Sequence, residues 1–208
     1  MNNQNVYILE DRGILYINGA DAKEFLQNMI SNDINKVSED SSCFASLLTP
    51  QGKFLFAFII IKHKSGYFID CEKSQTEALF KQLSVYKLRS KVEIMNLSNE
   101  FVVAAFNKEK FLEFEGSKDI AGNTIKYRED SILLDPRNKD LGARLIINLE
   151  KLYLSLKKLE SVCICGLIWS FVKHLLIKSL LLFFVCCLNL SLLYLIFVVE
   201  LLNDSSHF

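Results

Sequence analysis

One long apolar stretch dominates the first 160 residues of the chain, Leu47 to Lys62, and a short polar segment, Thr49 to Gly52, interrupts it. Proline presets its own φ for the second position of a tight turn, and a glycine two positions later tolerates positive φ, so the segment predicts a hairpin. No polar side chain occurs from Phe54 to Ile61. We therefore expect a strand there that is buried on both faces, in the middle of a sheet.

Before this hairpin, the pattern predicts strands and one helix. Two short apolar runs, Val6–Leu9 and Ile14–Asn18, are separated by a turn-forming cluster, which predicts a first hairpin. In Ala20–Ser31 the apolar side chains recur at helical spacing, and Asn32-Asp33 follows as a stop signal. Cys43–Leu48 is then the strand that enters the central hairpin.

After Lys62 the pattern alternates between strands and helices. Leu79, Leu83 and Tyr86 supply the expected buried stripe of the first of these helices. The further predicted strands are Tyr67–Cys71, Val92–Leu97, Phe101–Phe106, Thr124–Tyr127, Ile132–Leu134 and Ala143–Ile147, and the helices are Lys73–Tyr86 and Leu149–Leu159. Hairpins mixed with helices, without strict strand–helix–strand repetition, favour an α+β domain with a largely antiparallel sheet and flanking helices.

Composition argues against nucleic-acid binding, a metal site and secretion. The 24 basic and 24 acidic residues give no net charge, so a direct nucleic-acid partner is not expected, and the basic Lys87, Arg89 and Lys91 are interpreted as a solvated strand or helix end. The histidines and cysteines are not spaced as metal ligands, so no metal site is predicted. The first residues lack a signal-peptide pattern, from which a cytoplasmic location of the domain is expected.

The composition changes abruptly after residue 160, which predicts a domain at 1–160 and an all-apolar helical tail at 161–208. Residues 179–199 carry no charge and are long enough to cross a ~30 Å hydrocarbon core as a helix, so a membrane anchor is one interpretation. A buried core helix is less favoured because it needs more protein around it. A shifted reading frame is the third interpretation, and it would make 1–160 a truncated domain.

Four motifs, in this order, carry a family likeness. They are Gly19-Ala20-Asp21-Ala22 with Phe25-Leu26-Gln27 and Ser31-Asn32-Asp33; Leu47-Leu48-Thr49-Pro50-Gln51-Gly52-Lys53; Tyr86-Lys87-Leu88-Arg89-Ser90-Lys91-Val92; and Asp135-Pro136-Arg137 through Leu141-Gly142-Ala143-Arg144. Over residues 6–159 the chain resembles the YgfZ-type folate-binding proteins, relatives of the T protein (aminomethyltransferase) of the glycine cleavage system.

The resemblance implies a chain wrapped around a central channel that binds a tetrahydrofolate derivative. It also implies a role in assembling or repairing iron-sulfur clusters in certain enzymes, including some that modify tRNA, so iron-sulfur enzymes are the expected partners. By likeness, the residues expected near the folate channel are Asn32, Asp33, Thr49, Gly52 and Asp70. Each also has a simpler local interpretation: Asn32 and Asp33 as a helix stop, Thr49 and Gly52 as turn residues, and Asp70 as a cap of the following helix. Asp135-Pro136-Arg137 is interpreted as a turn with a surface ion pair.

The resemblance also separates the two relatives. The T protein has an acidic pair just after the hairpin glycine, whereas this chain has Phe56 and Ala57, which cannot position charge or protons as a carboxylate does. Aminomethyl transfer is therefore not expected. The K-G-C-Y-x-G-Q-E motif of the YgfZ branch does not occur, and its role is not assigned to Cys163 or Cys165. No catalytic residue is predicted. The alternatives are an aminomethyltransferase and a tail-anchored membrane protein without an enzymatic role.

Overall fold

The computed structural model describes residues 6–127 and 130–151, which all belong to one structural unit. Of the predicted helix Leu149–Leu159, only 149–151 are described, and they form a turn. The predicted tail at 161–208 lies outside the described residues. Within these residues, no helix is both long enough and apolar enough to span a bilayer.

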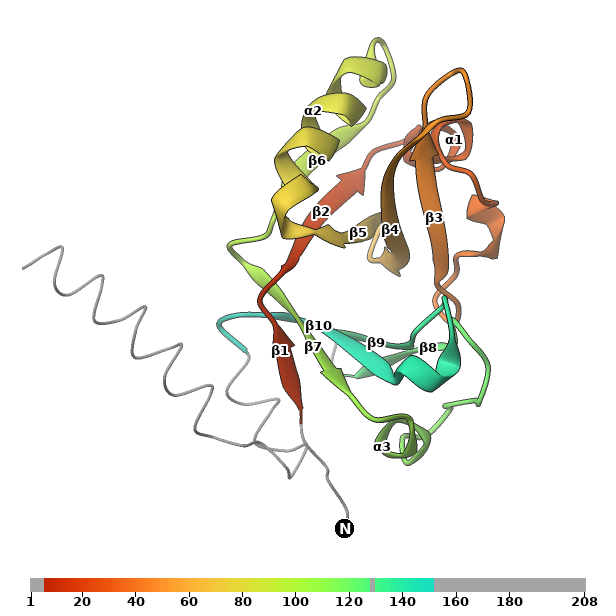
Figure 1. The fold of residues 1–208 in the computed structure, drawn as a ribbon, viewed down its shortest axis with the longest axis vertical. Coiled ribbons are helices and arrows are strands. Elements are labelled where there is room, and N and C mark those ends of the chain that lie inside the picture. Colours follow the sequence, from red (N-terminus) through yellow and green to blue (C-terminus); the bar gives the residue numbers. More distant parts are fainter. Residues whose placement is uncertain (1–5, 128–129, 152–208) are drawn as a thin grey trace, which may run out of the picture. The chain divides into compact units, whose positions relative to one another are not determined.

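Two five-stranded sheets, antiparallel throughout, make up the described domain (Figure 1). Sheet B has the order β3-β4-β5-β2-β6: β3 Cys43–Leu48, β4 Phe54–His63, β5 Gly66–Glu72, β2 Arg12–Asn18 and β6 Glu93–Asn96. Sheet A has the order β1-β7-β10-β9-β8: β1 Tyr7–Leu9, β7 Phe101–Phe106, β10 Ala143–Asn148, β9 Asp130–Leu134 and β8 Thr124–Tyr127. The described helices are α1 Ala22–Met29, α2 Thr76–Lys87 and α3 Lys108–Leu112, with 3-10 turns at Ile34–Lys36, Lys73–Gln75 and Lys139–Leu141.

The predicted antiparallel α+β class is confirmed, but the expectation of one sheet is wrong. The predicted first hairpin is also wrong, because β1 pairs with β7 in sheet A while β2 lies in sheet B. Both edges of β2 are already occupied, by β5 on one side and β6 on the other, so β2 has no free edge for β1. The chain therefore changes sheets between Leu9 and Arg12.

The central hairpin forms as predicted. The N–H of Gly52 donates to the carbonyl of Thr49 (2.8 Å), and Gly52 has φ +79°, which a residue without Cβ adopts at little cost. Burial on both faces holds only for Phe58–Ile61, since the strand begins exposed at Phe54 (61%). β5, rather than β4, is the middle strand of sheet B.

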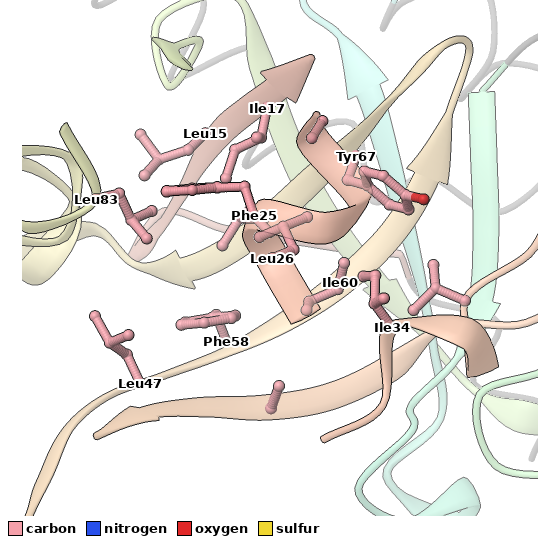
Figure 2. Close-up of a cluster of buried hydrophobic side chains, with 14 of the residues drawn as sticks. Leu15, Ile17, Phe25, Leu26, Ile34, Leu47, Phe58, Ile60, Tyr67 and Leu83 are labelled. Atoms are coloured by element: carbon pink, nitrogen blue, oxygen red, sulfur yellow. The ribbon is translucent and has the colours of Figure 1, made fainter. Parts of the chain in front are cut away.

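Helices α1 and α2 cover one face of sheet B. Phe25 and Leu26 of α1 pack against Phe58 in the cluster that Figure 2 shows. Leu79 and Leu83 of α2 complete this core, but Tyr86, predicted to be buried, is 37% exposed near the end of its helix. Amphipathic spacing thus sets which side of each helix faces the sheet.

The other face of sheet B packs against sheet A. Side chains of β4 alternate between these faces, so that Phe58 and Ile60 face the helices while Ile59 and Ile61 join the core between the sheets. Sheet A contributes the buried residues Val103, Leu133 and Ile146 to this second core, and its partly buried Leu9 and Phe101 pack against it. Because each face of β4 packs on one of these two cores, every side chain from Phe58 to Ile61 is apolar.

Candidate functional site

A charged side chain, Asp70 of β5, lies within the apolar junction of the two sheets and is only 1% exposed. Its Oδ1 accepts a hydrogen bond from Nε of Arg12 (2.7 Å), and its Oδ2 accepts one from Nη1 of Arg144 (2.8 Å). Nη2 of Arg12 also donates to the backbone carbonyl of Asp70 (2.9 Å). Two arginines, one from each sheet, therefore hold one buried carboxylate.

The contacts continue from Arg144 to a second carboxylate. Nε of Arg144 donates to Oδ2 of Asp135 (3.0 Å), which is 2% exposed. Arg137 binds the same carboxylate through Nε (2.9 Å) and Nη2 (2.7 Å), and its backbone N–H donates to Oδ1 (3.0 Å). We call the five residues Arg12, Asp70, Arg144, Asp135 and Arg137 the ion chain.

The ion chain alternates in charge and contains one more cation than anion. It begins on β2 and β5 of sheet B and ends on β10 and on the segment that follows β9 of sheet A, so it ties the two sheets together. Because guanidinium groups bind carboxylates in fixed planar geometry, such a chain specifies orientation more than a single ion pair does.

The two carboxylates respond differently to their surroundings. Burial raises the pKa of Asp70, against the opposing charges of Arg12 and Arg144. Burial also acts to raise the pKa of Asp135, but the hydrogen bonds from Arg137 and the charge of Arg144 outweigh it and hold this pKa below its usual value. Asp135 is therefore ionised throughout the neutral range.

This geometry corrects two local interpretations. Asp70 does not cap the following helix, because it lies within β5 and the 3-10 turn begins after Glu72. The Asp135–Arg137 pair is not a surface pair, because the carboxylate is buried and shared with Arg144.

The predicted residues Asn32 and Asp33 lie together beside the outer edge of β3. Nδ2 of Asn32 donates to the carbonyl of Phe44 (2.9 Å), and its Oδ1 accepts from the N–H of Asp33 (2.8 Å). The carboxylate of Asp33 accepts from the N–H of Asn35 (2.9 Å) and so caps the 3-10 turn. They do not stop α1 directly, because α1 ends three residues earlier, at Met29.

The structure separates the predicted residues into three places. Thr49 and Gly52 form the β3–β4 turn, where Oγ1 of Thr49 accepts from the N–H of Lys53 (3.1 Å). Asn32 lies near the start of β3, so about 16 Å of extended strand, at ~3.3 Å per residue, separates it from Thr49. Asp70 lies in the ion chain, and both of its carboxylate oxygens already accept from arginine.

The acidic pair expected of a transferase is replaced by apolar side chains that face opposite ways. Phe56 pairs with Leu47 and packs on the core under α1, whereas Ala57 pairs with Ser46. Cross-strand partners share a face of the sheet. On the Ala57 side lie Phe44, Ser46, Leu48 and Phe54, and we call these four residues together with Ala57 the hairpin face. Three of its large side chains are exposed, and it contains no carboxylate.

The two cysteines of the described residues are poor nucleophiles. Burial raises the pKa of the Cys43 thiol to about 11 and also raises that of Cys71, which lies against the hydroxyl of Thr76 (3.5 Å). Residues 6–127 and 130–151 contain no group of three His, Cys, Asp or Glu side chains arranged to bind a metal.

Sequence reasoning did not identify Arg12 and Arg144 as site residues. Each is a single charge at a position in or beside an apolar strand, as is Asp70. A charged residue in a strand that otherwise reads as buried implies a buried partner of opposite charge. That signal was present, but the partners lie 58 and 74 residues apart in the chain, so spacing alone could not pair them.

The sequence is similar to two groups of curated proteins. One is the mitochondrial iron-sulfur cluster assembly factor IBA57 homolog of Dictyostelium discoideum, 25% identical over 165 residues that cover 67% of this chain and 40% of that protein. The other is the tRNA-modifying protein YgfZ, for example of Buchnera aphidicola subsp. Schizaphis graminum, 31% identical over 107 residues that cover 50% of this chain and 34% of that protein. The chain thus spans well under half the length of these relatives. No family model matches it.

Solved structures share the fold at low sequence identity. The aminomethyltransferase T of the glycine cleavage system from Bartonella henselae superposes with a TM-score of 0.63 over 77% of this chain and 47% of that chain, at 13% identity. Heterotetrameric sarcosine oxidase from Corynebacterium sp. U-96 gives a TM-score of 0.52 over 74% of this chain, at 9% identity. The described domain therefore has an α+β fold of the aminomethyltransferase type. Within that class, the chain is similar in sequence to the IBA57 homolog and to YgfZ, and it shares its fold with the glycine cleavage T protein.

Proposed function

We propose that the chain carries part of a folate-binding protein of the YgfZ type that serves iron-sulfur cluster assembly or repair and, through its client enzymes, tRNA modification. The observation that carries this proposal is the similarity to proteins named for iron-sulfur cluster assembly and for tRNA modification, on a fold shared with an aminomethyltransferase. Iron-sulfur enzymes are the partners it implies, and a tetrahydrofolate derivative is the ligand.

The hairpin face suits the ring systems of such a ligand. Phe44, Leu48 and Phe54 are large, apolar and exposed on one side of the β3–β4 hairpin, and a flat pterin or aminobenzoyl ring gains by covering them. Asn32 and Asp33 lie along the outer edge of β3 and already make local hydrogen bonds, but the second N–H of the Asn32 amide and Oδ2 of Asp33 are groups of the kind that hydrogen-bond a pterin. Thr49 and Gly52 shape the end of the hairpin.

Asp70 takes a different part in this proposal. Its carboxylate is buried and already held by Arg12 and Arg144, so Asp70 acts as a positioning residue that fixes sheet A against sheet B. Any effect of Asp70 on folate binding passes through that orientation rather than through a direct contact.

The second candidate is an aminomethyltransferase, and only the fold favours it. With Phe56 in the core under α1 and Ala57 on the hairpin face, no carboxylate occupies the position from which a transferase would act. Formation of methylenetetrahydrofolate and ammonia by the purified chain, when it is supplied with tetrahydrofolate and an aminomethylated carrier thiol, would establish this second function instead.

The division into a domain at 1–160 and a tail at 161–208 remains a proposal, as do truncation by a shifted frame and a membrane anchor at 179–199. Translation of the gene past codon 160 in the other two reading frames tests the frameshift. A K-G-C-Y-x-G-Q-E motif in one of these frames would establish the frameshift, and its absence would exclude it. Membrane fractionation of the expressed chain tests the anchor.

Isothermal titration of the full chain with 5-formyltetrahydrofolate tests folate binding. Wild-type chain should bind, and Ala57→Arg, which fills the hairpin face, should raise Kd at least tenfold. Ile120→Arg, at an exposed apolar position in the loop before β8, is the matched control and should leave Kd unchanged. Absence of binding by wild type, or equal binding by Ala57→Arg, would count against this ligand.

The cellular part of the proposal needs its own measurement. Deleting the gene should lower the activity of enzymes that contain a [4Fe–4S] cluster while leaving the amounts of those proteins unchanged, and the intact gene should restore activity. Unchanged iron-sulfur enzyme activities in the deletion strain would contradict the assignment even if folate binds.

A further inference from the structure

The last turn of α2 and the residue that follows it expose an unusual amount of apolar surface. Leu88 is 85% exposed, the highest fraction among the large apolar side chains of residues 6–127 and 130–151, and its neighbours Val85 and Tyr86 are exposed as well. An isolated exposed apolar side chain is ordinary, but three within four residues form a patch. Neither the ion chain nor the hairpin face uses these residues.

The same segment concentrates positive charge. Between Glu77 and Glu93 no acidic residue occurs, and the basic ones are Lys81, Lys87, Arg89 and Lys91. The whole chain has no net charge, so this excess is local. A cationic rim around exposed apolar side chains is complementary to a surface with an apolar pocket and acidic surroundings.

The turn is held in one shape. The N–H of Ser90 donates to the carbonyl of Lys87 (2.8 Å), and the N–H of Lys91 donates to the carboxylate of Asp21 (2.7 Å) beside α1. A Cβ at Gly19 would overlap the carbonyl oxygen of Lys91, which shows how closely the two segments approach. The patch is therefore preorganised rather than a loose loop.

Leu88 itself adopts a strained backbone, with φ +43° and ψ −112°. Glycine would relieve that strain, since it lacks the Cβ that makes positive φ costly. A large apolar side chain that is both strained and exposed contributes little to the fold. Its side chain is available to a partner.

We propose that residues 85–91 form a docking surface for an acidic partner protein, with Leu88 as the apolar anchor and Lys87, Arg89 and Lys91 as the cationic rim. Tyr and Arg, both present here, are enriched among the residues that contribute most to binding at protein interfaces. A fixed turn matches a shaped protein pocket, which a fluid lipid surface does not require. A second copy of the chain would set like charges against each other.

The test begins with the full chain carrying the photocrosslinker p-benzoylphenylalanine in place of Val85, irradiated in extract of the source cells. The crosslinked protein is identified by mass spectrometry and purified, and its affinity for the unmodified chain is measured by titration at low and high salt. We expect one acidic protein, with Kd rising at least tenfold between 50 mM and 300 mM salt, and this outcome does not depend on whether the chain binds folate.

Variants then separate anchoring from folding. Leu88→Gly suits the backbone at this position, so it should leave the thermal midpoint unchanged or higher while raising Kd for the partner at least tenfold. Leu141→Ser, at another exposed apolar residue, is the matched control and should not change Kd. Equal binding by Leu88→Gly and wild type would overturn the proposal.

Other occupants would overturn it in recognisable ways. Crosslinks to no protein, to a basic protein or to a second copy of the chain would each exclude an acidic partner at this surface. The chain could also sediment with vesicles of phosphatidylcholine and phosphatidylserine, and Leu88→Gly could abolish this sedimentation. That result would assign the patch to lipid and would likewise exclude an acidic partner protein.

Discussion

Replacing Arg144 by methionine should destabilise the domain more than any other single change in the ion chain. Arg144 contacts both buried carboxylates, and its loss leaves Asp70 with Arg12 alone and Asp135 with Arg137 alone. Removing one partner of a buried pair typically costs about 3–5 kcal/mol, against a total stability of about 5–15 kcal/mol for a domain. Because Asp70 and Asp135 are only 1% and 2% exposed, solvent cannot compensate for the missing charge.

Arg137→Met is the matched control. Its side chain is 39% exposed, and Asp135 keeps Arg144 after the substitution, so the expected loss is about 1 kcal/mol. Urea unfolding of the full chain, followed by far-ultraviolet circular dichroism, gives both losses. Adding Asp70→Leu to Arg144→Met should recover part of the stability, because it removes the buried carboxylate that has lost one of its two arginines, while the remaining Arg12 is 16% exposed and can reach solvent.

Equal losses of unfolding free energy in Arg144→Met and Arg137→Met would show that Arg144 has no special place in the ion chain. A double variant that is less stable than Arg144→Met by the full cost of Asp70→Leu alone would show that Asp70 and Arg144 act independently, contrary to their contact.

Three further outcomes follow from the structure. Gly66→Ala should lower the unfolding midpoint clearly more than Gly52→Ala, because a Cβ at Gly66 would overlap the backbone carbonyl of Ile17, whereas one at Gly52 meets no atom within 4 Å and has only the cost of φ +79°; equal effects would contradict the packing at β2–β5. Phe58→Ala should cost about 3–5 kcal/mol, measured by urea unfolding, since Phe58 is fully buried in the core under α1; a loss below about 1 kcal/mol would refute that placement. Asp135 has a folded pKa below its usual 3.8, so its contribution is complete above that value and is lost as pH falls through the folded pKa. The difference in unfolding free energy between wild type and Asp135→Asn should therefore stay constant from pH 7 to about 5 and shrink below about pH 4, and a difference that is flat throughout would show that Asp135 is not ionised in the fold.

Local signals predicted most elements of the fold. The turn at Thr49–Gly52 and the strands Cys43–Leu48 and Thr124–Tyr127 form as expected, because turn chemistry and apolar alternation act within a few residues. The stripe of α1 also faces the core, since helical spacing alone decides which side is apolar.

The division into two sheets could not be predicted in this way. β1 and β2 are nearly adjacent in sequence, yet β1 pairs with β7 and β2 with β5, because both edges of β2 are occupied by other strands. Helix α3, Lys108–Leu112, was missed because five residues in a charged segment give no periodic signal. Pairing over long chain separations decides both the topology and the partners of Asp70.

The sequence predicted individual residues of the candidate site but not their arrangement. The residues expected near folate lie in three places: at the edge of β3, at the hairpin turn and in the ion chain. The family resemblance could identify these residues, but it could not show that they are separated in the fold. The apolar character of Phe56 and Ala57 was readable from the sequence. Their opposite orientations, which put Ala57 alone on the hairpin face, needed the register of β3 against β4.

Hydrogen–deuterium exchange of the full chain, with and without saturating 5-formyltetrahydrofolate, tests whether the β3–β4 hairpin binds folate. We expect slower exchange in residues 43–63, which form the β3–β4 hairpin, and no change in α3 at Lys108–Leu112, with the protection lost in Ala57→Arg. Unchanged exchange in the hairpin at a ligand concentration that saturates binding elsewhere, or no protection anywhere, would contradict this expectation.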